Sequence, residues 1–278
     1  MYPLMIDLSN EYKKINKDIE FDISAGGAGK GMTDAISGLV DLGMISREIH
    51  EQETEKGIFH IPIARDAVIP VVNSKNPLLQ KLKSSGLNKT QFLNIFIDGK
   101  TTKWETLYSS DTESTQINVY TRSDACGAAD VWALYLGKKQ EDLLGTGVFG
   151  DPGLAEAVSR DINGIGYNNI NFAYDNKTNL MRDGLSPVPI DLNNNGKIDE
   201  DENFYGSLSD MVKAIADNKY PSPPSRNLYL VSFGKPDKQI VKDFLIWILN
   251  NGEEAVKSAG YINLPKNENL KSLELLTK

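Results

Sequence analysis

The chain of 278 residues has a single cysteine, Cys126, and only two histidines. One thiol cannot form a disulfide within the chain, so no disulfide framework holds this fold together. The two histidines, His50 and His60, have no cysteine or paired carboxylate at the spacing of a metal site. Cysteine usage alone is compatible with the cytosol and equally with a secreted protein.

Positive charge and long apolar runs are scarce as well. The 30 Lys and Arg residues are outnumbered by 38 Asp and Glu residues, which gives a net charge of -8. Nucleic-acid surfaces need clustered Lys and Arg, so this class of partner is excluded. The richest apolar run, 244–249, is far shorter than the roughly 20 residues that a membrane helix needs. The residues 1–4 also lack the basic and apolar segments of a signal peptide.

Strand and helix patterns alternate along what remains, a chain with 40% hydrophobic residues and a mean hydropathy of -0.35. Apolar spacing predicts helices near 4–15, 32–39, 128–136, 208–216, 235–249 and 253–258, and strands near 19–23, 42–45, 58–63, 67–72, 117–121 and 228–231. This order favours an α/β fold with mainly parallel sheets. The strands near 67–73 and 227–232 bracket the middle of the chain, as an inserted second lobe would require. We therefore predict one lobe from 1–73 plus 231–278 and another from 74–230.

A glycine-rich segment lies between the first predicted strand and the following helix. Its small side chains leave backbone N–H groups uncovered at the positive end of a helix dipole, a geometry that binds anions. The segment is not a Walker A loop, because Ser24 and Gly31 stand where that pattern needs glycine and Ser or Thr. The alternative is a packing turn without a ligand. The candidate ligand-binding residues here are Gly26, Gly27, Ala28, Gly29, Lys30 and Gly31.

A second small-residue turn joins the strand near 117–121 to the next predicted helix. It adds Arg122, whose planar guanidinium suits bidentate contact with an oxyanion, and Asp124, which is placed to orient that guanidinium. The alternative is a helix-capping aspartate beside an exposed arginine. The hydroxyl of Ser46 and the guanidinium of Arg47 follow the strand near 42–45. The candidates from these two segments are Arg122, Asp124, Ala125, Cys126, Gly127, Ala128, Ser46 and Arg47.

Taken together, the segments 26–48, 66–73, 121–136, 157–167 and 244–265 resemble the phosphate-binding proteins of bacterial ABC importers. The resemblance covers nearly the whole chain. It implies a two-lobed type II periplasmic-binding-protein fold with a ligand cleft between the lobes. It also implies an extracytoplasmic, non-enzymatic solute-binding protein that captures phosphate or a similar oxyanion and docks on a membrane permease. A monomer without a catalytic cofactor is expected.

The chain departs from the family pattern at four ligand positions. Ala28 stands where the family has serine, and Cys126-Gly127-Ala128 replaces Ser-Gly-Thr. The family aspartate that accepts a proton from phosphate falls at Ser46. Because a carboxylate reads the ligand proton, its loss predicts weaker rejection of sulfate. Anion binding is therefore a firmer expectation than phosphate specificity.

The beginning of the chain departs from the family too. Family members have a strand and a ligand-contacting turn before the helix that here starts near Pro3. We therefore expect a fragment or a misassigned start, whose full form carries a secretion signal and is periplasmic or membrane-anchored.

The segment 191–202 matches the calcium-loop pattern at every defining position. The preceding residues 187–190 look extended, which predicts an isolated loop with a structural Ca²⁺ rather than a pair of calcium-binding helices. The alternative is a polar surface turn. The predicted metal ligands are Asp191, Asn193, Asn195, Lys197 through its carbonyl, Asp199 and Glu202.

Two other functions remain open from the sequence. One is a calcium-stabilised interaction or sensor module with a vestigial cleft. The other is an enzyme with Cys126 as nucleophile, since a helix start lowers a thiol pKa.

Overall fold

The computed structural model describes residues 1–108 and 115–278, which divide into two compact units. Unit 1 comprises Met1–Asp66 and Arg226–Lys278, and unit 2 comprises Ala67–Ser225. Both crossings between units fall inside long strands, whereas the sequence analysis places the boundaries after residues 73 and 230. At the first crossing the strand continues from one unit into the other without a turn signal, which is the feature that marks a boundary in a sequence.

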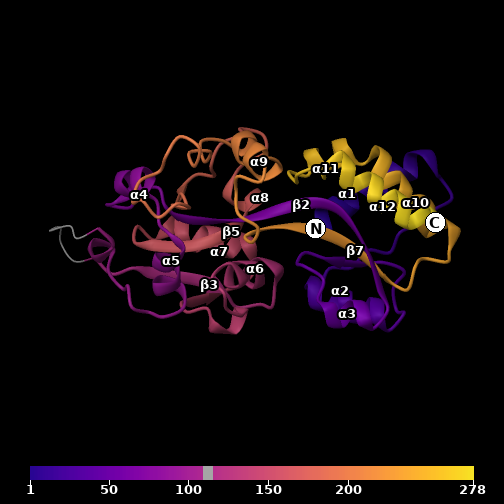
Figure 1. The fold of residues 1–278 in the computed structure, drawn as a ribbon, viewed down its shortest axis with the longest axis horizontal. Helices are drawn as coiled ribbons and strands as arrows, with labels where there is room; N and C mark the ends of the chain where they lie inside the picture. Colours follow the sequence, from indigo (N-terminus) through magenta and orange to yellow (C-terminus); the bar gives the residue numbers. More distant parts are fainter. Residues whose placement is uncertain (109–114) are drawn as a thin grey trace. The chain divides into compact units, whose positions relative to one another are not determined.

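Unit 1 begins with a helix whose apolar face is buried, as the sequence predicts. Four of its side chains, Leu4, Met5, Leu8 and Tyr12, are at most 5% exposed and recur at helical spacing. The ring of Tyr12 lies 5.0 Å from that of Phe244. The elements of this unit are α1 (Tyr2–Ile15), α2 (Gly27–Ile36), β1 (Gly43–Ile45), α3 (Glu51–Glu55), α10 (Gln239–Asn251), α11 (Glu253–Ser258) and α12 (Lys266–Thr277). Figure 1 shows α10, α11 and α12 side by side.

The predicted strand at residues 19–23 is wrong. Ile19, Phe21 and Ile23 do pack against the core with period two, and Phe21 lies 4.8 Å from Phe244 between ring centroids. The segment has no strand assignment, however, and the backbone groups of residues 20–25 form no hydrogen bond with any described part of the chain. Alternation of apolar residues shows which side faces the core, but a strand also needs a neighbour for its ladder.

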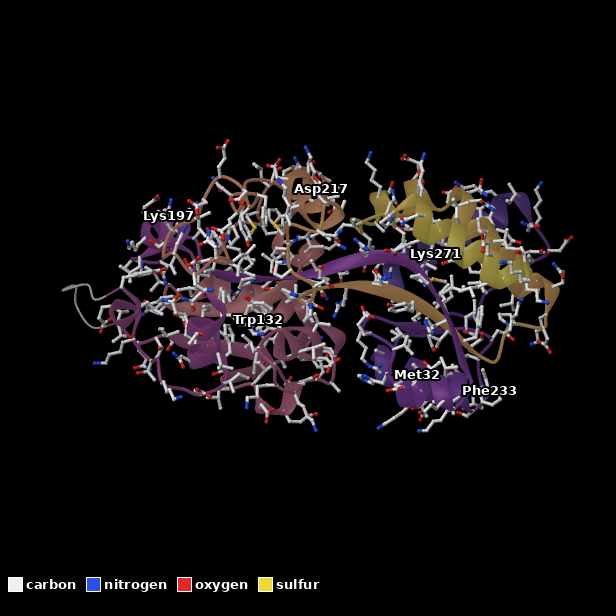
Figure 2. The ribbon with its side chains drawn as sticks, viewed as in Figure 1. Met32, Trp132, Lys197, Asp217, Phe233 and Lys271 are labelled. Atoms are coloured by element: carbon white, nitrogen blue, oxygen red, sulfur yellow. The ribbon has the colours of Figure 1, made fainter. Side chains whose placement is uncertain are left out.

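Unit 2 has an aromatic core around α6. Trp132, labelled in Figure 2, is fully buried and contacts Phe92 and Phe96 edge-on at 5.2 and 5.4 Å. Tyr167 stacks on it at 5.8 Å. The helices of this unit are α4 (Leu79–Ser85), α5 (Lys89–Phe96), α6 (Gly127–Tyr135), α7 (Gly150–Arg160), α8 (Ile170–Ala173) and α9 (Leu208–Ala216), with short 3₁₀ turns at Trp104–Leu107 and Gln140–Asp142.

The sheet is mixed, so the prediction of an α/β fold is confirmed but the prediction of mainly parallel sheets is wrong. The strands are β2 (Ile58–Asn73), β3 (Asn118–Arg122), β4 (Thr146–Val148), β5 (Gly164–Asn169), β6 (Leu185–Pro187) and β7 (Ser225–Phe233). In unit 2, β3 runs parallel to β4 and β5, while β2 runs antiparallel to β5 and β6. In unit 1, β1 pairs antiparallel with β7. Strand directions depend on partners distant in sequence, which apolar spacing does not reveal. None of the helices in the described residues is long and apolar enough to span a membrane.

Two neighbouring glycines of α2 differ in the space around them, which gives a matched pair of variants. A Cβ on Gly31 would lie 2.8 Å from the carbonyl oxygen of Met44 in β1, whereas a Cβ on Gly29 would meet nothing within 4 Å. We expect Gly31→Ala to lower the free energy of unfolding by about 1–3 kcal/mol, because α2 must move away from β1. Gly29→Ala should leave it unchanged or raise it slightly, since alanine favours the helix. Urea unfolding of both variants tests this, and equal losses would contradict it.

Candidate functional site

The glycine-rich segment of unit 1 forms the first turn of α2 rather than a loop before it. The helix begins at Gly27 with Gly26 as its N-cap, so residues 26–29 carry the amides that lack an acceptor within the helix. The sequence analysis also assigns backbone donors to Lys30 and Gly31. Those two positions fall inside the helix, and their predicted contact with an anion stays a prediction. The side chain of Lys30 forms an ion pair with Asp34.

A cavity of about 650 Å³ in unit 1 borders this helix start. The same cavity is lined by the apolar side chains of Tyr12, Phe21 and Phe244. The predicted ligand residues that line it are Gly26, Gly27, Ala28, Lys30, Gly31 and Ser46. Gly29 and Arg47 are not among its lining residues in the described chain. Residues predicted from two separate segments therefore do come together in unit 1.

Arg47 instead binds a carboxylate of its own unit. Its two terminal nitrogens donate to the two oxygens of Glu53, at 2.9 and 2.7 Å. Burial raises the pKa of Glu53, but the bonds from Arg47 and from the His50 amide outweigh burial, so the pKa lies below its ordinary value. Arg47 is thus held by an internal ion pair, and its predicted contact with an anion stays a prediction.

Arg122 of unit 2 lies at the end of β3 with only 9% of its surface exposed. Its Nε and Nη2 donate to the two oxygens of Asp124 at 2.8 and 2.6 Å, so the predicted orienting role of Asp124 is confirmed. Nη1 lies 2.8 Å from Asp151 Oδ2 at the start of α7. Burial lowers the pKa of Arg122, but the two carboxylates outweigh burial and raise it above its ordinary value. The guanidinium is therefore a permanent, buried positive charge.

Asp124 connects this guanidinium to the surrounding backbone. Its bonds from Arg122 lower its pKa, burial opposes them, and the amide of Gly150 adds a further bond of 3.1 Å. The hydroxyl of Tyr167 accepts a hydrogen bond from the backbone amide of Arg122. It also shares a hydrogen bond of 2.8 Å with the hydroxyl of Thr121. Arg122 is held in one orientation by β3, β5 and α7 together.

The turn after Arg122 leads directly into α6. Cys126 is the N-cap residue and its sulfur accepts the amide of Ala129 at 3.5 Å. Gln140 fixes the turn, because it accepts the amide of Cys126 at 3.1 Å and donates to the carbonyl of Asp124 at 2.8 Å. The amide of Cys126 is therefore already bonded, whereas Ala128 lies among the first four amides of the helix.

The thiol of Cys126 is not activated. Burial raises its pKa, and the opposing effects of Arg122 and of the Ala129 amide do not compensate. The sequence analysis expects a lowered pKa at this helix start, and that expectation is wrong because burial outweighs the dipole. Both histidines of the chain belong to unit 1, whereas Cys126 belongs to unit 2.

Comparison with known proteins identifies the family. A model described as a PBP superfamily domain matches residues 1–251. The chain belongs to the PBP superfamily. It is 28% identical to Protein SphX of Synechococcus elongatus over 95% of this chain and 75% of that protein. It is 27% identical to the phosphate-binding protein PstS of Staphylococcus epidermidis over 95% and 76% of the two chains.

A solved structure agrees with the PBP superfamily fold. A substrate-binding protein of a phosphate ABC transporter from Clostridium perfringens, described as putative and solved with bound phosphate, matches with a TM-score of 0.72 at 22% identity. The match covers 95% of this chain and 96% of that one. The predicted resemblance to phosphate-binding proteins and the predicted fold class are confirmed by these matches.

The segment 191–202 of this PBP superfamily chain is a loop closed by its own hydrogen bonds. Asp191, 3% exposed, accepts the amides of Asn195 and Gly196 at 3.2 and 2.9 Å. Glu202, equally buried, accepts the amide of Leu192 at 2.8 Å. The described residues contain no group of three or more Asp, Glu, His or Cys side chains placed to hold a metal.

Asp199 of this loop is held by amides and a lysine instead. The side-chain Nδ2 atoms of Asn193 and Asn195 donate hydrogen bonds to Asp199 at 2.9 and 2.6 Å, and Lys197 forms an ion pair with it at 2.6 Å. The bond from Lys197 and those from the two asparagines lower the pKa of Asp199 to about 2. Metal binding by this loop stays a prediction.

Three residues of the Arg122 site are absent from the sequence-based candidates: Gln140, Asp151 and Tyr167. Each lies between 14 and 45 positions from its partner in the turn. No spacing rule connects residues that far apart, so the sequence carried no signal for them.

Proposed function

We propose that this chain is an extracytoplasmic solute-binding protein that captures a tetrahedral oxyanion, most favourably phosphate, for an ABC-type importer. The single observation that carries the proposal is Arg122, a buried and permanently charged guanidinium held by Asp124 beside the start of α6. The phosphate-binding names of its relatives support the choice of phosphate. Binding requires only hydrogen-bond donors and positive potential, so no general base or activated nucleophile is needed.

The start of α2 in unit 1 is the second donor set in this proposal. Its amides at residues 26–29 lie at the positive end of a helix dipole, and Gly26, Gly27 and Ala28 line the cavity of that unit. Local dipoles and one guanidinium outweigh a net charge of -8 at short range, so the acidic composition does not oppose anion binding.

Titration calorimetry of the chain with sodium phosphate, sodium arsenate and sodium sulfate tests the proposal. We expect saturable binding of phosphate and arsenate with a stoichiometry of one. A substitution of Arg122 should lower the affinity for phosphate. Heat-silent titrations with all three anions would overturn the proposed function.

Docking on a membrane permease, a monomeric state and a location outside the cytoplasm are parts of the same proposal. They are supported by the family resemblance. Light scattering of the anion-bound chain checks the monomeric state directly.

We also propose that the loop 191–202 binds one structural Ca²⁺. The pattern supplies oxygens at all ligand positions, and Asp191 and Glu202 already lie buried at the base of the loop. Addition of CaCl₂ should raise the melting temperature by several degrees, because an ion that binds only the folded state stabilises it by mass action. Glu202→Gln removes the carboxylate at the closing position and should abolish the shift. A melting temperature insensitive to calcium would leave the polar surface turn as the correct interpretation.

A further inference from the structure

The cavity of unit 1 is bordered by two stretches of backbone that have unused hydrogen-bonding groups. Residues 20–25 and residues 42–44 both line it. The backbone of residues 20–25 forms no hydrogen bond with any described residue. The strand β1 pairs with β7 on one edge and ends the strand order, so its other edge has no strand beside it in the described chain. Two incomplete strand edges, each offering N–H and C=O groups, therefore border one cavity.

Helices cover both faces of the sheet beside this cavity. The side chain of Leu230 in β7 belongs to the apolar cluster of α1 and α10, whereas the next residue, Val231, packs with α2. Successive side chains of a strand point to opposite faces, so these helices lie on opposite sides of the sheet. Tyr12, Phe244 and Ala28 bring both sets of helices to the cavity. A strand buried on both faces is a nearly continuous apolar run rather than an alternating one.

The charged side chains at the cavity favour a basic partner. Two of the lining residues are lysines, and each already forms an ion pair with an aspartate of the same unit. Glu20 and Asp22 also line the cavity, are exposed, and form no ion pair with any described residue. The unbalanced charge there is negative, so a partner with Lys or Arg beside its apolar run is complementary.

We propose that unit 1 binds an extended apolar peptide, supplied by a partner, as an additional strand between residues 20–25 and β1. The peptide is a β-branched run of about five or six residues, the length of a typical strand, with a basic residue at its ends. Its main chain pairs with both open edges, and its side chains fill the cavity. The apolar alternation of Ile19, Phe21 and Ile23 then belongs to a strand that has a partner.

Hydrogen exchange measured by NMR, with the capped peptide Lys-Val-Ile-Val-Ile-Val-Lys, tests the proposal. In the free chain the amides of residues 20–25 should exchange rapidly, because none has a backbone acceptor in the described chain. Saturating peptide should slow alternate amides of residues 20–25 and of β1 by roughly tenfold or more, since each new backbone bond must open before exchange. The amides of α6 in unit 2 should not change. Calorimetry should give one peptide per chain.

Two controls separate strand pairing and charge from simple apolar contact. A peptide with proline in place of the central valine lacks one donor and should bind roughly tenfold more weakly or worse. Asp22→Lys should weaken binding of the lysine-flanked peptide roughly two- to fivefold at low salt and leave it unchanged at 1 M salt. Asp18→Lys is the matched variant, because Asp18 is exposed nearby but does not line the cavity. It should have a smaller effect than Asp22→Lys.

The outcomes are distinct. Slowed exchange at residues 20–25 and in β1, with weaker binding of the proline peptide, would establish the strand site. The proposal would be overturned by an absence of peptide binding, by binding that leaves those amides unchanged, or by equal binding of both peptides. A dimer of the chain in which those amides are already protected would also overturn it, since a second copy would then be the occupant. Phosphate takes no part in these measurements, so this inference and the proposed function fail independently.

Discussion

Arg122→Met should lower the affinity for phosphate roughly 30- to 3,000-fold. Removing one member of a buried, hydrogen-bonded charge pair costs about 2–5 kcal/mol in binding, and every 1.4 kcal/mol is a factor of ten. Two effects add here, since the variant loses the guanidinium and also leaves Asp124 and Asp151 as unpaired carboxylates beside an incoming anion. Calorimetry with sodium phosphate at two salt concentrations measures the loss.

Two further variants control this prediction. Arg122→Lys keeps the charge but loses the bidentate fork to Asp124, so we expect an intermediate loss. Arg160→Met removes an arginine whose side chain is 79% exposed and forms an ion pair with Glu156 along α7, so affinity should stay unchanged. A normal phosphate affinity in a folded Arg122→Met protein would show that the anion binds elsewhere.

Arg226→Met should lower the free energy of unfolding by about 3–5 kcal/mol, the second large effect expected from this structure. Arg226 and Asp66 form an ion pair of 3.0 Å with side chains only 2% and 4% exposed. The pair lies in unit 1, where β2 and β7 each approach the boundary with unit 2. Without the arginine, the buried carboxyl group of Asp66 loses this partner, which explains the size of the penalty.

The double variant Asp66→Leu with Arg226→Met separates two effects on the free energy of unfolding. One is the net contribution of the ion pair, and the other is the loss caused by removing only one partner. Replacing both charges with apolar groups should recover most of the stability, because neither charge is then desolvated. Arg65→Met is the control on the neighbouring residue, because the ion pair of Arg65 with Glu268 is partly exposed. This variant should lower the free energy of unfolding by about 1 kcal/mol. Urea unfolding that gives equal losses for Arg65→Met and Arg226→Met would contradict this account.

Local patterns predicted the helices well and the strands less well. The helix α9 is predicted and observed at 208–216, because its apolar spacing lies within the element and its N-cap Ser207 directly precedes it. The segment 19–23 has an equally regular apolar pattern but no pairing partner in the described residues. A helix completes its backbone hydrogen bonds internally, whereas a strand completes them with a segment that may be far away in the sequence.

The same contrast divides the candidate site. The bond between Arg122 and Asp124 joins residues two positions apart, and the sequence predicted it. Asp151 pairs with the same guanidinium from 29 positions away, and no local pattern indicated it. The pKa of Cys126 is raised rather than lowered, since the sequence shows that a helix starts there but not how deeply the thiol is buried.

The sequence by itself determined the α/β class, the family, the two small-residue helix starts and the pairing of Arg122 with Asp124. The family follows from the resemblance of whole segments, and the others follow from patterns among residues close together in the sequence. Tertiary structure alone decided the directions of the strands, the ion pair that engages Arg47, and the second carboxylate on Arg122. Each of these depends on burial and on contacts between distant segments, which exist only after the chain has folded.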